Sequence, residues 1–273
     1  MENLVDKIAN ALDKDSLYSV LDSLSSDQWA DPDIHDAVLK AVQWFREAVM
    51  EMLGWALPES AYEQYADVME EALRTDGSLL RHIPVGLRNK SLCERAVMTS
   101  GAALEFVPKR LRTDDICLAA VRSHPYGHPI QYFPERLLTE EILLPILRNT
   151  KGRAFAFIPQ EKRTEALCEE AVRFRGDNLC LVPVELRTKD ICFEAAKKYA
   201  PAVPYIPEKC LSRDFCERLA KERPVVISLI QEKYLTLKAY YEAVSRESSL
   251  IRYVPEEMLS RAFLTYVESL SWE

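Results

Sequence analysis

The chain has 273 residues, a hydrophobic content of 48%, a formal net charge of −8 and 7 glycines, which indicates a protein that buries a core and disfavours glycine-rich phosphate loops and turn-dense β folds. No apolar run approaches the ~18 residues that span a bilayer, and the acidic start MENLVDKIAN lacks the basic and apolar regions of a signal peptide. We therefore expect a helical protein that is cytoplasmic or delivered into a host cytosol.

Residues 1–75 form an acidic N-terminal region. They hold sixteen Asp and Glu against five Lys and Arg, a net charge of −11, which leaves −8 − (−11) = +3 for residues 76–273. Helices are predicted over residues 2–12, 15–24, 32–53 and 59–74. We expect this region to cap the helices that follow, because an end repeat would otherwise expose its apolar face. Its last helices fit a divergent repeat equally well.

One cluster in this region has the side chains of a metal site. Asp31, Asp33, His35 and Asp36 stand close together in the sequence. A helix that begins at Asp31 with Pro32 in its first turn explains the same acids, because carboxylates are favourable at a helix N-terminus. We favour the helix start over the metal site.

From Ile83 onward, an apolar residue followed by proline recurs at intervals of 24, 26, 25, 24, 24 and 48 residues. The positions are Ile83-Pro84, Val107-Pro108, Phe133-Pro134, Ile158-Pro159, Val182-Pro183, Ile206-Pro207 and Val254-Pro255. The last interval is two periods, with Ile230-Gln231 at its midpoint. Residues 76–273 are thus predicted to hold about eight repeats of 24 residues.

Each repeat contains the signals of one helix of about 10 residues. Five residues after the proline position stands a side chain that can cap a helix N-terminus, namely Asn89, Thr113, Thr139, Thr164, Thr188, Ser212, Thr236 or Ser260. Apolar residues follow at i, i+1, i+4 and i+5, which makes one buried face. Glycines predicted to end helices are Gly101, Gly127, Gly152 and Gly176.

A second short apolar stretch precedes each proline. Its pattern fits a strand or a 3₁₀ helix, and we favour the helix because the asparagine ladder of leucine-rich repeats is absent. The fold class predicted is all-α, a right-handed α-solenoid in which each repeat pairs an α-helix with a short α or 3₁₀ helix.

The repeats read VP-x-x-L-R-T-x-x-I-C-x-x-A-V, as at residues 107–121 and 182–196. This pattern resembles a poorly characterised helical-repeat family of unknown function, found in bacteria and protists and in effector-like proteins. The resemblance covers about residues 80–267 and implies an architecture without catalytic residues. Pro145 inside the third helix and Gln231 at a proline position depart from the pattern, so we expect irregular stacking there.

Five cysteines share one repeat position, namely Cys93, Cys117, Cys168, Cys192 and Cys216. Equivalent atoms of neighbouring repeats lie roughly 8–10 Å apart, too far for a disulfide. The sequence contains no C-x-x-C pair, so a zinc site is not expected. We expect buried, reduced thiols and a reducing compartment. His124 and His128 are spaced as metal ligands on a helix would be, but Pro125 and Gly127 between them favour a solvated loop.

The candidate binding residues are arginines that stand one residue before the helix cap, namely Arg88, Arg112, Arg163 and Arg187. A row of guanidinium groups would bind the carboxylates or phosphates of a partner. The alternative is a structural role, with the aliphatic stem packed and the charge in water. Leucine replaces the arginine in the other repeats, at Leu138, Leu211, Leu235 and Leu259.

Aromatic residues recur two positions before the proline, at Phe106, Tyr132, Phe157, Tyr205 and Tyr253. We interpret them as core residues rather than as a platform that stacks on nucleic-acid bases.

No Ser-His-Asp or Cys-His set is present in a family-like motif, so we predict neither an enzyme nor a metal or cofactor. The leading hypothesis is a monomeric protein–protein interaction module, a bacterial effector, immunity or adaptor protein that docks one partner along the solenoid. A helical-repeat nucleic-acid binder is disfavoured by the charge of −8 and by variable surface positions. An enzyme with an unrecognised site in the acidic N-terminal region stays open.

Overall fold

A computed structural model of the chain describes residues 3–261, 263 and 265. In this part α-helices alternate with 3₁₀ helices and no strand is present, which confirms the all-α class. No helix here is long and apolar enough to cross a membrane. The chain divides into two compact units, Met1–Leu137 and Leu138–Glu273. The predicted division into residues 1–75 and 76–273 concerns the onset of the repeats and stays a prediction.

The first unit begins with a helical group around one long helix. Its elements are α1 (Leu4–Ala9), α2 (Lys14–Asp22), α3 (Ser26–Trp29), α4 (Pro32–Trp55), η1 (Glu59–Ala61) and α5 (Ala66–Thr75), where η marks a 3₁₀ helix. The first three helices pack on α4, which packs on α5. The predicted helices near residues 2–12, 15–24 and 32–53 are present, whereas the one over 59–74 is interrupted and α3 was not predicted.

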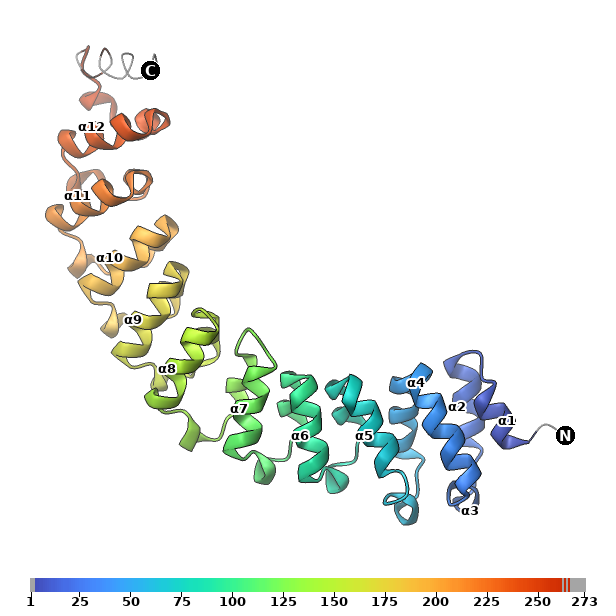
Figure 1. Cartoon of the computed structure of the whole chain (residues 1–273). Coiled ribbons are helices and arrows are strands. Elements are labelled where there is room, and N and C mark those ends of the chain that lie inside the picture. Colours follow the sequence, from blue (N-terminus) through green and yellow to red (C-terminus); the bar gives the residue numbers. More distant parts are fainter. Residues whose placement is uncertain (1–2, 262, 264, 266–273) are drawn as a thin grey trace. The chain divides into compact units, whose positions relative to one another are not determined.

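The rest of the first unit follows the repeat. Its elements are η2 (Gly77–His82), η3 (Val85–Leu87), α6 (Lys90–Thr99), η4 (Gly101–Phe106), η5 (Lys109–Leu111), α7 (Asp114–Arg122), η6 (His128–Tyr132) and η7 (Glu135–Leu137). Helices α5, α6 and α7 pack in series, and so do η2, η4 and η6 (Figure 1). The segment from α5 to η3 has the element order of the later repeats, which agrees with the divergent repeat that the sequence left open.

The second unit continues the same order of one α-helix and two 3₁₀ helices. Its elements are α8 (Glu140–Asn149), η8 (Arg153–Phe157), η9 (Gln160–Lys162), α9 (Glu165–Phe174), η10 (Gly176–Leu181), η11 (Val184–Leu186), α10 (Lys189–Lys198), η12 (Ala200–Tyr205), η13 (Glu208–Cys210), α11 (Arg213–Glu222), η14 (Pro224–Ser228), η15 (Glu232–Tyr234), α12 (Leu237–Arg246), η16 (Ser248–Tyr253) and η17 (Glu256–Met258). Successive α-helices pack on one another, as do η8, η10, η12, η14 and η16 (Figure 1).

The predicted helix caps are largely confirmed. The side chains of six cap residues accept a hydrogen bond from the backbone N–H three residues further on, in Asn89, Thr113, Thr164, Thr188, Ser212 and Thr236. Ser260 accepts one from Phe263 at 3.3 Å, although the helix predicted there continues beyond the described residues. Thr139 makes no cap bond, and its helix contains Pro145, so α8 departs from the pattern at both points.

Glycines set the distance between successive repeats. A Cβ atom added to Gly77, Gly101 or Gly176 would lie 1.9, 2.0 or 2.3 Å from the carbonyl oxygen of an alanine in the next α-helix. Only Gly127 and Gly152 have the positive φ of a helix-ending glycine, at 77° and 76°. The interpretation of Gly101 and Gly176 as helix-ending residues is therefore wrong, because each begins a 3₁₀ helix and is needed for close approach.

The five cysteines at the shared repeat position are buried and free, as predicted. Burial raises the pKa of Cys93, Cys117, Cys168 and Cys216 to about 11 and that of Cys192 to about 12. These thiols are therefore protonated and inert near neutral pH, because the thiolate is the reactive form.

Labelling with a disulfide reagent at pH 8 should modify Cys180, which is exposed, and spare the other cysteines until denaturant is added. The folded pKa values lie above the ordinary value of 9.0, so the unfolded chain loses these protons first. Stability should consequently fall as the pH rises above about 9. Rapid labelling of Cys117, Cys168 and Cys192 in the native protein would contradict their place in the core.

Candidate partner-binding surface

The predicted arginines bind backbone carbonyl groups. In Arg187, Nε donates to Val182 O at 2.9 Å, Nη1 to Tyr205 O at 2.8 Å and Nη2 to Cys180 O at 3.4 Å. Val182 and Cys180 belong to the 3₁₀ segment before the arginine, whereas Tyr205 ends the 3₁₀ helix of the next repeat. The guanidinium thus joins two successive repeats, and we call this arrangement the arginine clamp.

The other three arginines make equivalent contacts. Nε of each donates to the carbonyl oxygen five residues earlier, at 2.6 Å for Arg88, 2.9 Å for Arg112 and 3.0 Å for Arg163. Their Nη1 atoms donate to the next repeat, at the carbonyl oxygens of Phe106, Tyr132 and Leu181. These carbonyl groups lie at 3₁₀ helix ends, where no backbone donor satisfies them. The rigid fork of donors in arginine suits such a site.

The clamp bears on the structural role considered for these arginines and on the expectation that their charges lie in water. The guanidinium heads do not lie free in water, because each is held by carbonyl oxygens and is half-buried. This supports a structural role for Arg88, Arg112, Arg163 and Arg187, with the charge held by carbonyl oxygens and not in water as that alternative expected. Binding of a partner by these residues stays a prediction, and it would have to use the N–H groups that the clamp leaves over.

Removal of a clamp should destabilise the fold measurably. Arg187→Ala leaves three carbonyl oxygens without their donor, and we expect a loss of about 1–2 kcal/mol, since part-exposed groups recover some solvation. Arg187→Lys should lose a similar amount, because an ammonium group cannot span the three acceptors. Urea denaturation monitored by circular dichroism measures both, and unchanged midpoints would exclude the clamp as a stabilising contact.

The aromatic residues before the prolines are not core residues. Phe106, Tyr132 and Phe157 are half-buried, and Tyr205 and Tyr253 are 46% and 40% exposed. The expectation of a core position is therefore wrong. Two rows of η12 are spaced by the 3₁₀ period of three residues. Ala200, Val203 and Ile206 are buried along one row, whereas Tyr205 is the exposed end of the other row, three residues after the buried Ala202.

In the second unit this position holds an apolar side chain in every described repeat. The residues two before each proline position are Phe157, Leu181, Tyr205, Leu229 and Tyr253, which we call the apolar column. Four of them end η8, η10, η12 and η16, and Leu229 directly follows η14; these 3₁₀ helices pack in series. Leu229 is 41% exposed, so the column presents apolar side chains to solvent in three successive repeats, whereas Phe157 and Leu181 are half-buried.

A groove lies beside the column where the clamp is interrupted. Its volume is about 410 Å³, and its lining includes Pro204, Ile206, Leu211, Leu229 and Tyr234. We call it the Leu211 groove. Glu208, also in its lining, accepts hydrogen bonds from Lys233 Nζ at 3.2 Å and from Tyr234 OH at 3.5 Å.

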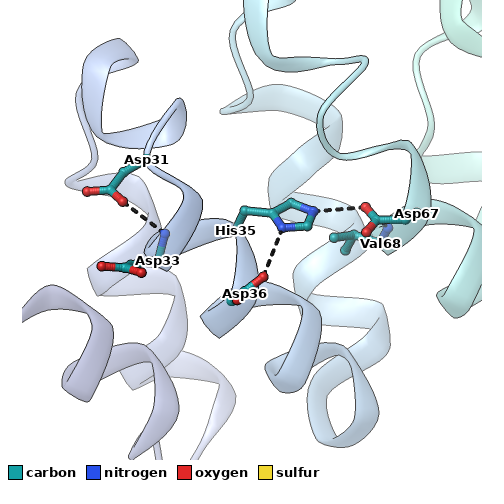
Figure 2. A network of polar contacts seen from close by, with 6 residues as sticks. All are labelled: Asp31, Asp33, His35, Asp36, Asp67 and Val68. Carbon is teal, nitrogen blue, oxygen red and sulfur yellow. Dashed lines mark hydrogen bonds and ion pairs between the residues drawn. The ribbon is translucent and has the colours of Figure 1, made fainter.

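The acidic cluster of the first unit, which includes Asp31, Asp33, His35 and Asp36, makes contacts that cap α4 and join it to α5. Asp31 accepts a hydrogen bond from the backbone N–H of Asp33 at 2.9 Å, as an N-cap. Figure 2 shows His35 between two carboxylates, with Nε2 2.9 Å from Asp67 Oδ1 and Nδ1 3.4 Å from Asp36 Oδ1. The contact with Asp67 joins α4 to α5. These contacts support the helix-start interpretation of the cluster.

Among the residues that the structure describes, no three His, Cys, Asp or Glu side chains are arranged to hold a metal ion. The rings of His124 and His128 lie with centroids 5.7 Å apart. His124 lies in the turn after α7, and His128 begins η6, so the segment is not a free loop throughout.

Sequence reasoning missed the apolar column and the Leu211 groove as surface features. The signal for the groove was present, since leucine replaces arginine at position 211. This replacement predicts a groove only when the contacts of the arginine clamp are known, and the spacing of residues along the sequence does not reveal those contacts.

A family model described as a domain of unknown function (DUF4116) matches residues 66–112 and 89–138. The first match begins at the start of α5, ahead of the first proline position of the repeat. No curated protein and no solved structure matches the chain.

Proposed function

We propose that this chain is a protein–protein interaction module, a right-handed α-solenoid of about eight repeats that docks one partner protein along its surface. The observation that carries the proposal is the apolar column. Single exposed apolar side chains are ordinary, but Tyr205, Leu229 and Tyr253 are exposed at the same position of three successive repeats, as a docking surface would require.

The composition of the column supports a protein partner. Tyrosine and phenylalanine are enriched in protein interfaces and dominate their binding energy. The clamps at Arg163 and Arg187 join successive 3₁₀ ends, so a partner would meet a preorganised surface and little ordering entropy would be lost. The chain's charge of −8 works against nucleic acid as the partner.

The biological role proposed is that of a bacterial effector, immunity or adaptor protein. It follows from the resemblance of the repeats to effector-like proteins and from the lack of a recognisable catalytic motif. Each of these roles requires one stable docking surface and no chemistry, which is what the column would supply.

The test introduces a photo-crosslinking amino acid, p-benzoylphenylalanine, at position 205 or 253 of the full chain in the cell that produces it. We expect both positions to crosslink the same protein, which mass spectrometry then identifies. Position 199 is the matched control, because Tyr199 is also exposed, at 44%, but lies outside the column.

Variants then measure the contribution of the column to binding. The double variant Tyr205→Ser and Tyr253→Ser should lower the affinity for the identified partner by about tenfold or more. Tyr199→Ser should bind the partner like the wild type. Equal weakening by the column and control variants, or crosslinks that differ between positions 205 and 253, would count against the column as the docking surface.

A further inference from the structure

The Leu211 groove lies at the clamp position of its repeat but lacks the arginine, and η14 ends at Ser228, one residue before the position at which η12 ends. Arg187 binds the carbonyl oxygens of residues five and seven positions before it and eighteen positions after it. Leu211 stands 24 residues later, and its equivalent carbonyl groups belong to Ile206, Pro204 and Leu229. All three residues line the groove.

These three carbonyl oxygens are unused. None of them accepts a hydrogen bond from any residue in the described part of the chain. Leu211 is half-buried and has no donor to offer them. The three acceptors at positions equivalent to those that hold a guanidinium in the preceding repeat therefore belong to residues that line a groove of about 410 Å³, a size typical of small-molecule pockets.

We propose that the Leu211 groove binds an arginine side chain of the partner protein, whose guanidinium takes the place that the chain's own arginines occupy in the clamped repeats. That the arginine belongs to a partner protein rests on the proposed function, whereas the binding of an arginine side chain by the groove does not.

The charge around the groove fits this ligand. The Glu208 carboxylate adds a negative group beside the three carbonyl oxygens, and Tyr234 adds an aromatic ring on which a guanidinium can stack. Lys233 Nζ now lies 3.2 Å from Glu208 and 4.8 Å from the centre of the Tyr234 ring. Both partners of that ion pair are mostly exposed, so an incoming guanidinium can displace the ammonium at small cost.

The discriminating chemistry is the planar fork of donors. Lysine carries the same charge but only a point-like ammonium, and citrulline keeps the shape of arginine without the charge. An arginine site should therefore prefer arginine over both, whereas a merely acidic surface would accept lysine equally.

The experiment titrates the full chain with N-acetyl-arginine amide at low ionic strength and follows backbone amide resonances by NMR. We expect saturable shifts at Ile206, Leu211 and Leu229, with the corresponding lysine and citrulline amides at least about tenfold weaker. Equal binding of the three ligands, or shifts that do not include these residues, would overturn the proposal.

Three substitutions locate the site by the equivalence of positions 187 and 211 in the repeat. Leu211→Arg should fill the groove with the chain's own guanidinium and abolish the shifts, while Leu211→Met keeps the groove apolar and retains them. Arg187→Ala opens an equivalent framework one repeat earlier, so a second set of shifts should appear at Val182 and Tyr205. Undiminished binding to Leu211→Arg would refute the assignment.

A further variant, Glu208→Gln, keeps the proposal testable if Leu211→Arg does not fold. Glu208→Gln removes the charge of an exposed side chain, and it should lower the affinity for the arginine amide by about threefold or more. An unchanged affinity contradicts the proposal. The small ligand needs no partner protein, so failure of the groove and failure of the apolar column are separate results.

Discussion

Ala171→Asp should prevent the chain from folding at ordinary temperatures. The Ala171 side chain is 0% exposed, and its carbonyl oxygen accepts a hydrogen bond from Asn178 Nδ2 at 3.0 Å. A Cβ added to Gly152 of the preceding repeat would lie 3.0 Å from that oxygen, so the preceding repeat approaches this helix closely. A buried, unpartnered carboxylate costs several kcal/mol, which is comparable to the stability of a whole domain.

Ala166→Asp is the matched control for this substitution. Ala166 lies in the first turn of the same helix and is half-buried, so a carboxylate there reaches water and the positive end of the helix dipole. We expect its free energy of unfolding to stay within about 0.5 kcal/mol of the wild type. Thermal melts of both variants measure the difference, and a wild-type melt for Ala171→Asp would remove this residue from the core.

Gly176→Ala should destabilise the protein by about 2–4 kcal/mol, because overpacking against backbone leaves no rotamer to relax into. The added Cβ would lie 2.3 Å from Ala195 O and 2.9 Å from Tyr199 Cβ, both in the next repeat. The two repeats would have to separate, and the contacts of η10 with α10 and η12 would loosen. Urea denaturation gives the free energy of unfolding directly.

Gly86→Ala is the corresponding control, since a Cβ at that position meets no atom within 4 Å and its φ is not positive. We expect a change within about 0.5 kcal/mol, in the stabilising direction if the unfolded chain loses more freedom than the folded one. Equal destabilisation by the two substitutions would show that the glycines matter for backbone freedom and not for the approach of successive repeats.

The sequence by itself determined the features that depend on spacing along one chain. The prolines, the capping side chains and the i, i+1, i+4, i+5 apolar pattern predicted the helix starts and the buried cysteines, because caps and helix faces are local properties. The cap bonds of Thr164, Thr188 and Ser212 and the burial of Cys168 and Cys192 confirm this. Local signals fail at Thr139, whose cap bond is missing.

Only the tertiary structure decided what the repeated surface positions do, because their partners lie one repeat away. Arg187 looks like a solvent-facing residue until its contact with Tyr205 O in the next repeat is known. Gly176 looks like a helix end until the carbonyl group of Ala195 stands against it. Tyr205 shares an apolar pattern with buried neighbours and lies in register with the buried Ala202, yet it is 46% exposed, because burial at the end of η12 depends on what packs there and not on hydrophobicity or period.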